Sequence, residues 1–359
     1  MTEKKNTTDE QDNTKTTLVS HKLQPTITGN GRLVGGFVIS SVLFCLFWGP
    51  LIPVILVVAT IMGHVQTSAT IGICILSSMA VARHSPTLCR CFLQSCGYFT
   101  KGVTVHYEPE MLSAIAESVV GSLWCMHPHG TSLGMGFTLN GAIRFRAHDE
   151  ERYVHPQFRQ TMPQTRLRAA DGVQAPVLFN LPLVRNLLKG LGCCTPATKK
   201  NMFGLWKRQA DFGILPGGME EVALYQCGRE RVYLSKRAGF IKYGLQNGAL
   251  LLLAYTFGES DLYQSLSAGT IRQFQMWTLN RFGFIIPIFW GPRWYLPWLP
   301  RDDFPIDTVV GSPMQLPHIP NPTTEDVVKY HTLYMKSLRE LFDRHKSRFG
   351  YEDRELEIL

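Results

Sequence analysis

The sequence predicts a mixed α/β domain that is attached to a membrane by an N-terminal helical hairpin. A stretch of fifty residues, Leu33 to Ala82, contains no Asp, Glu, Lys or Arg. From about Gly97 onward, short apolar runs alternate with helix-like segments, a pattern typical of α/β layer structures. The 359 residues are 45% hydrophobic and 18% charged. This balance fits a globular protein at a membrane better than a disordered chain.

Residues 1–30 are expected to form a disordered polar tail. They contain almost no apolar side chains, so they cannot bury a core. The tail includes a glycosylation sequon, Asn6-Thr7-Thr8, which would be used only on the lumenal side of a membrane.

Residues 31–83 are expected to form a membrane-embedded hairpin. One span takes about 20 residues, so the uncharged stretch has room for two. Because proline interrupts helices, we expect one arm over Leu33–Trp48, a turn at Gly49–Pro53, and a second arm from Val54 to about Val81. A turn within Gly63–Thr70 is an alternative, and so is a pair of buried helices in a soluble protein.

The flanks of this hairpin predict its orientation. Lys22 and Arg32 precede the uncharged stretch, and Arg83, Arg90 and Lys101 follow it. Basic flanks stay on the cytosolic side. Both termini are therefore expected in the cytosol, where the sequon would remain unused.

Residues 84–359 are expected to form one catalytic domain facing the cytosol. The predicted strands are 122–126, 212–215, 249–255, 284–290 and 308–311. The predicted helices are 133–144, 183–189, 199–209, 239–246 and a last one between Thr323 and Gly350. The last helix is the best marked, because Thr323 can cap its start and Glu325 and Asp326 favour its positive end.

Charge and cysteine content narrow the class of partner. The net charge of +8 favours an anionic partner, such as nucleic acid, anionic lipid or a phosphorylated cofactor. The sequence has no zinc-finger spacing and no long Lys/Arg run, so we expect no nucleic acid. Nine cysteines are spread over the chain without a disulfide framework, which favours reduced thiols.

A histidine pair forms the first candidate site. His127-Pro128-His129-Gly130 follows a predicted strand, and α/β folds place their sites at the carboxyl ends of strands. Pro128 restricts the loop, Gly130 permits close approach of a ligand, and an imidazole is a credible general base near neutral pH. The alternative is a turn with two incidental histidines. The remaining histidines follow no ligand pattern, so we expect no metal site.

Two further segments are candidates for substrate binding. In Pro216-Gly217-Gly218, the two glycines follow a predicted strand, and their N–H groups could face an oxyanion or a phosphate. The carboxylates of Glu220 and Glu221 could orient an imidazole or bind a hydroxyl. A basic segment follows, with Arg229, Arg231, Lys236, Arg237 and Lys242; it is either a phosphate clamp or a solvated basic face.

Taken together, these segments resemble the diacylglycerol acyltransferase type 2 family, which includes the monoacylglycerol acyltransferases. The resemblance rests on the order of the apolar hairpin, HPHG, Gly-Gly-x-x-Glu at 217–221, Arg-x-Gly-Phe at 237–240, YTFGES at 255–260 and the C-terminal segment. It covers roughly residues 95–350. It implies a mixed sheet flanked by helices, as in glycerolipid acyltransferases. Their His-x4-Asp motif is absent, however.

The resemblance implies transfer of a fatty acyl chain from acyl-CoA to diacylglycerol, which forms triacylglycerol. His129 is expected to be the general base, His127 to shape the site or share the proton, and Glu221 to replace the missing orienting acid. N–H groups at Gly217 and Gly218 would stabilise the oxyanion, and Lys236 and Arg237 would hold the phosphates of CoA. Further substrate contacts are expected from Gly130, Pro216, Glu220, Gly239 and Phe240.

The acceptor is left open by the sequence, because monoacylglycerol or a long-chain alcohol would suit the same motifs. A non-catalytic lipid-binding membrane protein is an alternative of another class. The resemblance implies no cofactor apart from acyl-CoA as co-substrate. It also implies contact with membrane lipid and a location in the endoplasmic reticulum membrane, with the lipid droplet as an alternative. Whether the chain forms a homo-oligomer is left open.

Overall fold

The computed structural model describes residues 18–23, 31–95, 101–111, 121–131, 134, 138, 170–192, 194–266, 269–283, 285 and 288–359. The first helices are α1 Gly31–Trp48, α2 Ile52–Ile61, α3 Val65–Val81 and α4 Pro86–Ser95. The later helices are α8 Val184–Leu191, α9 Lys199–Lys207, α10 Gly218–Leu224, α11 Gly239–Asn247, α12 Gly269–Phe282 and α13 Thr324–His345. Short 3-10 helices are η2 Pro176–Asn180, η3 Glu259–Asp261 and η4 Lys346–Phe349.

The strands alternate with these helices along the chain. They are β1 Val19–Leu23, β2 Val103–Tyr107, β3 Ser122–His127, β4 Ala170–Gln174, β5 Cys194–Pro196, β6 Asp211–Ile214, β7 Arg231–Val232, β8 Leu250–Phe257, β9 Gln264–Ser265, β10 Phe289–Trp290, β11 Ile306–Val310, β12 Met314–Gln315 and β13 Glu357–Ile358.

Within the described residues, nine strands form a mixed sheet. The order is β1-β2-β11-β8-β3-β6-β4-β5, with β12 paired to β8. Strand β3 lies between β8 and β6 and is parallel to both, with Leu123 opposite Leu251 and Phe212. Strands β1 and β11 add antiparallel pairs with β2 and β8. The predicted mixed sheet flanked by helices is therefore confirmed.

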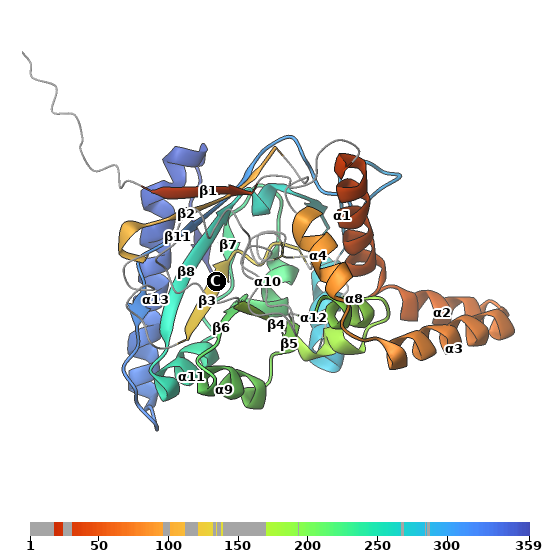
Figure 1. Cartoon of the computed structure of the whole chain (residues 1–359), viewed down its shortest axis with the longest axis horizontal. Helices are drawn as coiled ribbons and strands as arrows, with labels where there is room; N and C mark the ends of the chain where they lie inside the picture. Colours follow the sequence, from red (N-terminus) through yellow and green to blue (C-terminus); the bar gives the residue numbers. More distant parts are fainter. Residues whose placement is uncertain are drawn as a thin grey trace, which may run out of the picture.

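Both faces of the central strands are buried, which explains their continuous apolar sequences. Successive side chains of β3 enter two different cores, because neighbouring residues in a strand point to opposite faces. Leu123 packs with side chains from α9, α11 and α13, whereas Trp124 packs with side chains from α1, α4 and α8. Figure 1 shows α13 on one side of the sheet and α1 and α4 on the other.

Helix α1 differs from the predicted first hairpin arm because it belongs to the core. Ile39, Val42 and Leu43 are at most 4% exposed and pack against the sheet side of the first core. Trp298, from the loop after β10, donates its indole N–H to the Ser40 hydroxyl. The apolar stripe of α1 therefore contacts protein.

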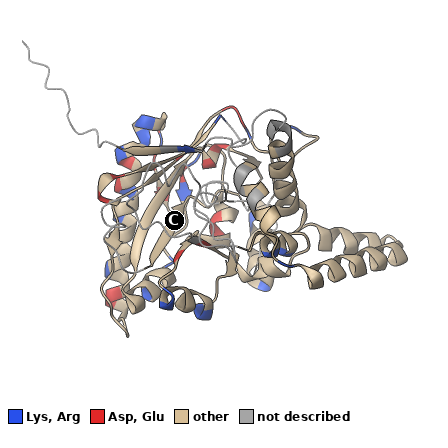
Figure 2. Ribbon diagram, in the orientation of Figure 1, with Lys and Arg blue, Asp and Glu red and all other residues tan. Residues whose placement is uncertain are grey.

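Helices α2 and α3 project from the body side by side (Figure 1) and carry no charged side chain (Figure 2). No residue of α2 is buried, and Ile61 is 80% exposed. The chain bends by 53° between α1 and α2 and reverses only at Met62–His64. The predicted interruption at Gly49–Pro53 is present as a turn at residues 49–51. The predicted reversal of the chain at this position is wrong, however, because the chain only bends there, and the alternative near Gly63 is closer. No single described helix is long and apolar enough to span a bilayer. The bent pair formed by residues 35–48 and 52–61 is long and apolar enough when the two helices are taken together.

Three other predictions need correction or lie outside the described residues. Part of the predicted disordered tail, Val19–Leu23, forms β1, because it pairs along its whole length with β2. Of the predicted strand 284–290, only Phe289–Trp290 is a described strand. The predicted helix 133–144 lies outside the described residues except for single positions. The last helix begins as predicted, since the Thr323 side chain and Asp326 form a reciprocal capping box.

Candidate active site

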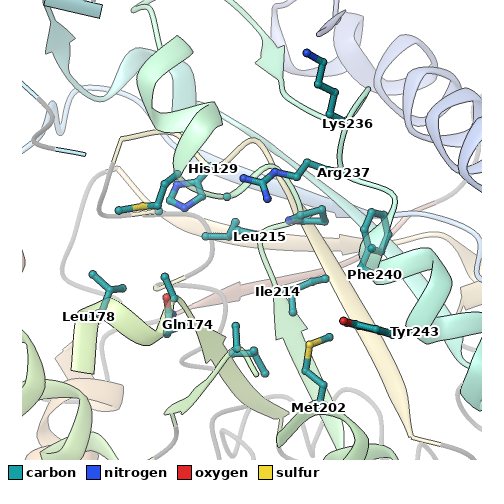
Figure 3. Close-up of a pocket in the computed structure, with 18 residues that line it drawn as sticks. His129, Gln174, Leu178, Met202, Ile214, Leu215, Lys236, Arg237, Phe240 and Tyr243 are labelled. Atoms are coloured by element: carbon teal, nitrogen blue, oxygen red, sulfur yellow. The ribbon is translucent and has the colours of Figure 1, made fainter. Parts of the chain in front are cut away.

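A cavity of about 450 Å³ opens where β3 and β6 end. Most of its wall is apolar, and His129 and Arg237 lie together at one end of it (Figure 3). The apolar part comes from residues after β4 and β6 and from helices α9 and α11. The described lining residues are His129, Gly134, Val173, Gln174, Ala175, Leu178, Ala197, Met202, Ile214, Leu215, Pro216, Gly218, Met219, Lys236, Arg237, Gly239, Phe240 and Tyr243.

His127 ends β3 and is not among the residues that line this cavity. Its side chain faces the same core as Leu123 and Cys125, and the residue is 1% exposed. The ring nitrogen Nε2 lies 2.7 Å from the hydroxyl of Tyr334 on α13. Burial, together with repulsion from His129, lowers the pKa of His127 to about 3. This histidine is neutral and anchors the loop to α13.

His129 lines the cavity, and its ring orientation is fixed by the main chain. Nδ1 lies 3.1 Å from the carbonyl oxygen of Thr131. A carbonyl can only accept, so the proton of the neutral ring resides on Nδ1, which leaves a lone pair on Nε2. Burial lowers the pKa of His129 to about 4. The ring is therefore neutral at physiological pH and can accept a proton at Nε2.

Glu221 holds the backbone of the loop rather than the imidazole. One carboxylate oxygen accepts the N–H of His129, and the other accepts the N–H of Tyr233 at 2.7 Å. The side chain is buried, and this burial raises the pKa of Glu221 to about 7 even though both N–H groups act in the opposite direction. The prediction that Glu221 orients the His129 ring is wrong, because the Thr131 carbonyl already does so.

Two glycines make room for buried carboxylates at this loop. A Cβ at Gly217 would collide with the Glu221 carboxylate. Gly130 has φ +66°, and a Cβ there would collide with the carboxylate of Glu259. Gly130 was predicted to admit a ligand, but it is glycine because a protein carboxylate fills the space.

The basic segment contributes Arg237 and Lys236 to the opposite wall. Arg237 forms an ion pair with Glu220 and points toward the ring of His129 (Figure 3). Its Nη2 atom also lies close to Gly218, 3.2 Å from where a Cβ atom would lie if that residue had one. Lys236 extends away from these two side chains in the same view. The arrangement places one guanidinium beside the candidate base.

One predicted oxyanion donor is already occupied. The Gly218 N–H donates to the carbonyl of Leu215 at 3.1 Å, so it cannot stabilise a substrate oxyanion. This prediction is wrong for Gly218, whereas the N–H of Gly217 stays a candidate.

The structure brings together most of the predicted site. Seven predicted residues line the cavity: His129, Pro216, Gly218, Lys236, Arg237, Gly239 and Phe240. The others support the wall from behind: His127, Gly130, Gly217, Glu220 and Glu221. The sequence reasoning missed Thr131, Tyr334 and Glu259. YTFGES was the only signal for Glu259, and nothing local pointed to the other two.

No group of three or more His, Cys, Asp or Glu residues within the described ranges is arranged to hold a metal ion.

Comparison with known proteins defines the class of protein. The profile of the family described as Diacylglycerol acyltransferase matches residues 120–359. Over 189 residues, the chain is 37% identical to Diacylglycerol O-acyltransferase 1 of Eremothecium gossypii, covering 50% of this chain and 41% of that protein. It is 36% identical over 192 residues to Acyl-CoA wax alcohol acyltransferase 2 of Mus musculus, covering 50% of this chain and 57% of that protein.

A third relative is Diacylglycerol O-acyltransferase 2 of Homo sapiens, 31% identical over 245 residues, covering 64% of this chain and 58% of that protein. Among solved structures, the 1-acyl-sn-glycerophosphate acyltransferase PlsC of Thermotoga maritima aligns over 87% of this chain and 94% of its own, with 12% identity and a TM-score of 0.37. The chain belongs to the diacylglycerol acyltransferase family. It spans about half the length of the curated relatives it matches.

Proposed function

We propose that this protein transfers a fatty acyl chain from acyl-CoA to the free hydroxyl of diacylglycerol, releasing triacylglycerol and CoA. The observation that carries the proposal is the neutral His129 ring, with Nε2 available, at the polar end of an apolar cavity. Such a cavity suits an acyl chain. Membership of the family supports the same reaction.

The chemistry proceeds by direct attack of the acceptor on the thioester. Nε2 of His129 accepts the hydroxyl proton while the acceptor oxygen bonds to the thioester carbon. The tetrahedral intermediate then collapses, the carbon–sulfur bond breaks, and the imidazolium returns its proton to the CoA thiolate. General-base catalysis of this kind contributes about 10²- to 10⁴-fold in rate.

We assign Arg237 to the oxyanion of this intermediate. The guanidinium lies beside the His129 ring (Figure 3), so it lies at the thioester end of a bound acyl-CoA. The phosphates of CoA lie at the other end of the pantetheine arm and need other partners. Lys236, which extends away from His129, is better placed for them than Arg237. An oxyanion donor contributes roughly 10²- to 10³-fold.

A long-chain alcohol is the second candidate acceptor. Its support is the mouse relative named a wax alcohol acyltransferase, which matches as well as the diacylglycerol enzymes do. The product would then be a wax ester.

We also propose that the protein is attached to the endoplasmic reticulum membrane, or alternatively to lipid droplets, with both termini in the cytosol. The exposed apolar side chains of α2 and α3 support this attachment, although α1 packs on the core. Protease treatment of sealed microsomes should remove tags from both ends, and protection of either tag contradicts this topology.

One assay tests the reaction and the acceptor together. Membranes that contain the full chain are incubated with labelled acyl-CoA and, separately, diacylglycerol, monoacylglycerol or hexadecanol, and the products are separated by thin-layer chromatography. We expect triacylglycerol as the main product. Wax ester as the main product would favour the second candidate. Lipid binding without any acyl transfer would instead identify a non-catalytic lipid-binding protein.

A further inference from the structure

A second cavity, of about 570 Å³, lies along the edge strand β5 between α8 and α9. Its wall is polar and differs from the apolar wall of the active-site cavity. The described lining residues are Asp171, Lys189, Gly192, Cys194, Thr195, Pro196, Lys200, Asn201, Gly204 and Arg208.

Positive side chains outnumber negative ones among the described residues that line this cavity. Lys189, Lys200 and Arg208 face it, and Asp171 is the one carboxylate among its described lining residues. None of the three cations forms an ion pair within the described part of the chain. By contrast, Arg231 pairs with Glu357 and Arg301 with Asp303. Three cations on the wall of one cavity are a favourable environment for a phosphate group.

Helix α9 connects this cavity to the active site. Met202 lines the active-site cavity, whereas Lys200 and Gly204, on neighbouring positions, line the second one. In an α-helix, residues 200 and 204 lie on one side and residue 202 on the other, so the two cavities are separated by about the 10–12 Å width of one helix.

The same cavity also lies near the apolar helices. Helix α8, which contributes Lys189, packs against α1 and α3. The wall formed by α8 therefore lies next to the base of the α2–α3 projection, where a phospholipid headgroup would be found if these helices enter a membrane. Figure 2 shows basic residues on both α8 and α9.

We propose that Lys189, Lys200 and Arg208 form a binding site for a phosphate group, separate from the catalytic loop. Two ligands carry this chemistry: the nucleotide end of acyl-CoA, and an anionic phospholipid headgroup. The first source rests on the proposed acyl-CoA reaction, in which Arg237 takes the thioester end and Lys236 is one partner for the phosphates. The second source does not depend on that reaction.

Direct binding tests the site without any turnover. The purified full chain in detergent is titrated calorimetrically with CoA, with dephospho-CoA, which lacks the 3′-phosphate, and with short-chain phosphatidylserine or phosphatidylcholine. The variants are Lys200→Gln and Arg208→Gln. Lys207→Gln, a basic residue in the same helix that lies outside the cavity lining, is the matched control.

We expect each variant to weaken binding of one anionic probe about 2- to 5-fold, because exposed charges contribute modestly, with the effect reduced at high salt. A loss confined to CoA identifies the nucleotide phosphate as ligand, and a loss confined to phosphatidylserine identifies the headgroup. Equal affinities in both variants and in Lys207→Gln, with unchanged thermal unfolding, overturn the proposal. A catalytically inactive protein that still shows these losses would contradict the proposed function but not the site.

Discussion

The two walls of the active-site cavity differ in how far their polar side chains are buried and bonded to other protein groups. On the His129 wall, polar groups are buried and hydrogen-bonded to one another. Glu221 accepts hydrogen bonds from two backbone N–H groups, and the Tyr334 hydroxyl is hydrogen-bonded to His127. On the opposite wall, Arg237 is only half-buried, pairs with Glu220 and points across the cavity. Changes on the first wall should therefore affect folding and catalysis together unless they remove only the base. Changes on the second wall should affect the substrate directly.

The largest expected effect is that of His129→Ala. Removal of a group that acts only in the transition state lowers kcat and kcat/KM together, here by about 10²- to 10⁴-fold. The thermal unfolding midpoint should change little, since among the described residues the ring forms a single hydrogen bond, to the Thr131 carbonyl. Steady-state rates on diacylglycerol and thermal unfolding of the same preparation test this.

His129→Gln and His127→Ala sharpen the first test. Glutamine cannot accept a proton usefully at neutral pH, so it should not restore turnover. His127→Ala should lower stability more than His129→Ala does, because it removes the imidazole that bonds to the buried Tyr334 hydroxyl and leaves that hydroxyl with only the weaker Cys125 thiol. A His129→Gln enzyme within a few-fold of the wild-type rate would show that the histidine is structural.

Arg237→Ala tests the other wall. If Arg237 is the oxyanion donor, its removal should lower kcat by roughly 10²- to 10³-fold. The KM for acyl-CoA should change little. Arg237→Lys should recover part of the rate, because it keeps the charge but loses the planar fork. Lys242→Ala, an exposed basic residue of the same segment outside the cavity lining, is the control. A raised KM with unchanged kcat would return Arg237 to the phosphate-binding role.

Glu221→Gln should give a smaller effect that combines stability and rate. An amide presents an NH₂ group to one of the two backbone N–H donors, so one buried donor loses its partner at a cost of about 1–3 kcal/mol. We expect a lower urea midpoint and about a tenfold loss of kcat as the loop shifts. The matched variant Glu220→Gln on the same helix should leave the midpoint nearly unchanged. Equal midpoints for the two variants would contradict the role given to Glu221.

The helices and strands around the site could be predicted where the sequence pattern within the element itself indicates them. The elements that were not predicted form because of contacts with residues far away in the sequence. Strand β3 is buried on both faces and therefore has a continuous apolar sequence, and α13 carries its capping box in four consecutive residues. Strand β1, with the sequence VSHKL, has no strong strand pattern and forms because β2 offers an unpaired edge. Helix α10 has only seven residues and starts after a glycine, so no cap marked it.

The candidate site shows the same division. HPHG and the basic segment were visible as residue types, and both contribute to one cavity. The partner of Glu221 is a backbone N–H 92 positions away, and the group that orients His129 is a carbonyl. Main-chain groups occur at every residue, so a motif of side chains cannot reveal them.

The smallest expected effect concerns the pH dependence of kcat/KM. An ordinary histidine base loses activity below about pH 6.5, but a neutral ring with a pKa of about 4 should keep kcat/KM constant down to about pH 5. Glu221, with its pKa raised to about 7, adds its own inflection, so the profile is measured in wild type and in Glu221→Gln. Stability must be followed in parallel. The lowered pKa values of His127 and His129 mean that the unfolded chain binds more protons between about pH 4 and 6.5, so stability falls there as pH decreases. The raised pKa of Glu221 acts in the opposite direction between about pH 4.5 and 7. A limb near pH 6.5 that persists in folded Glu221→Gln protein would show that the base is not the buried ring of His129.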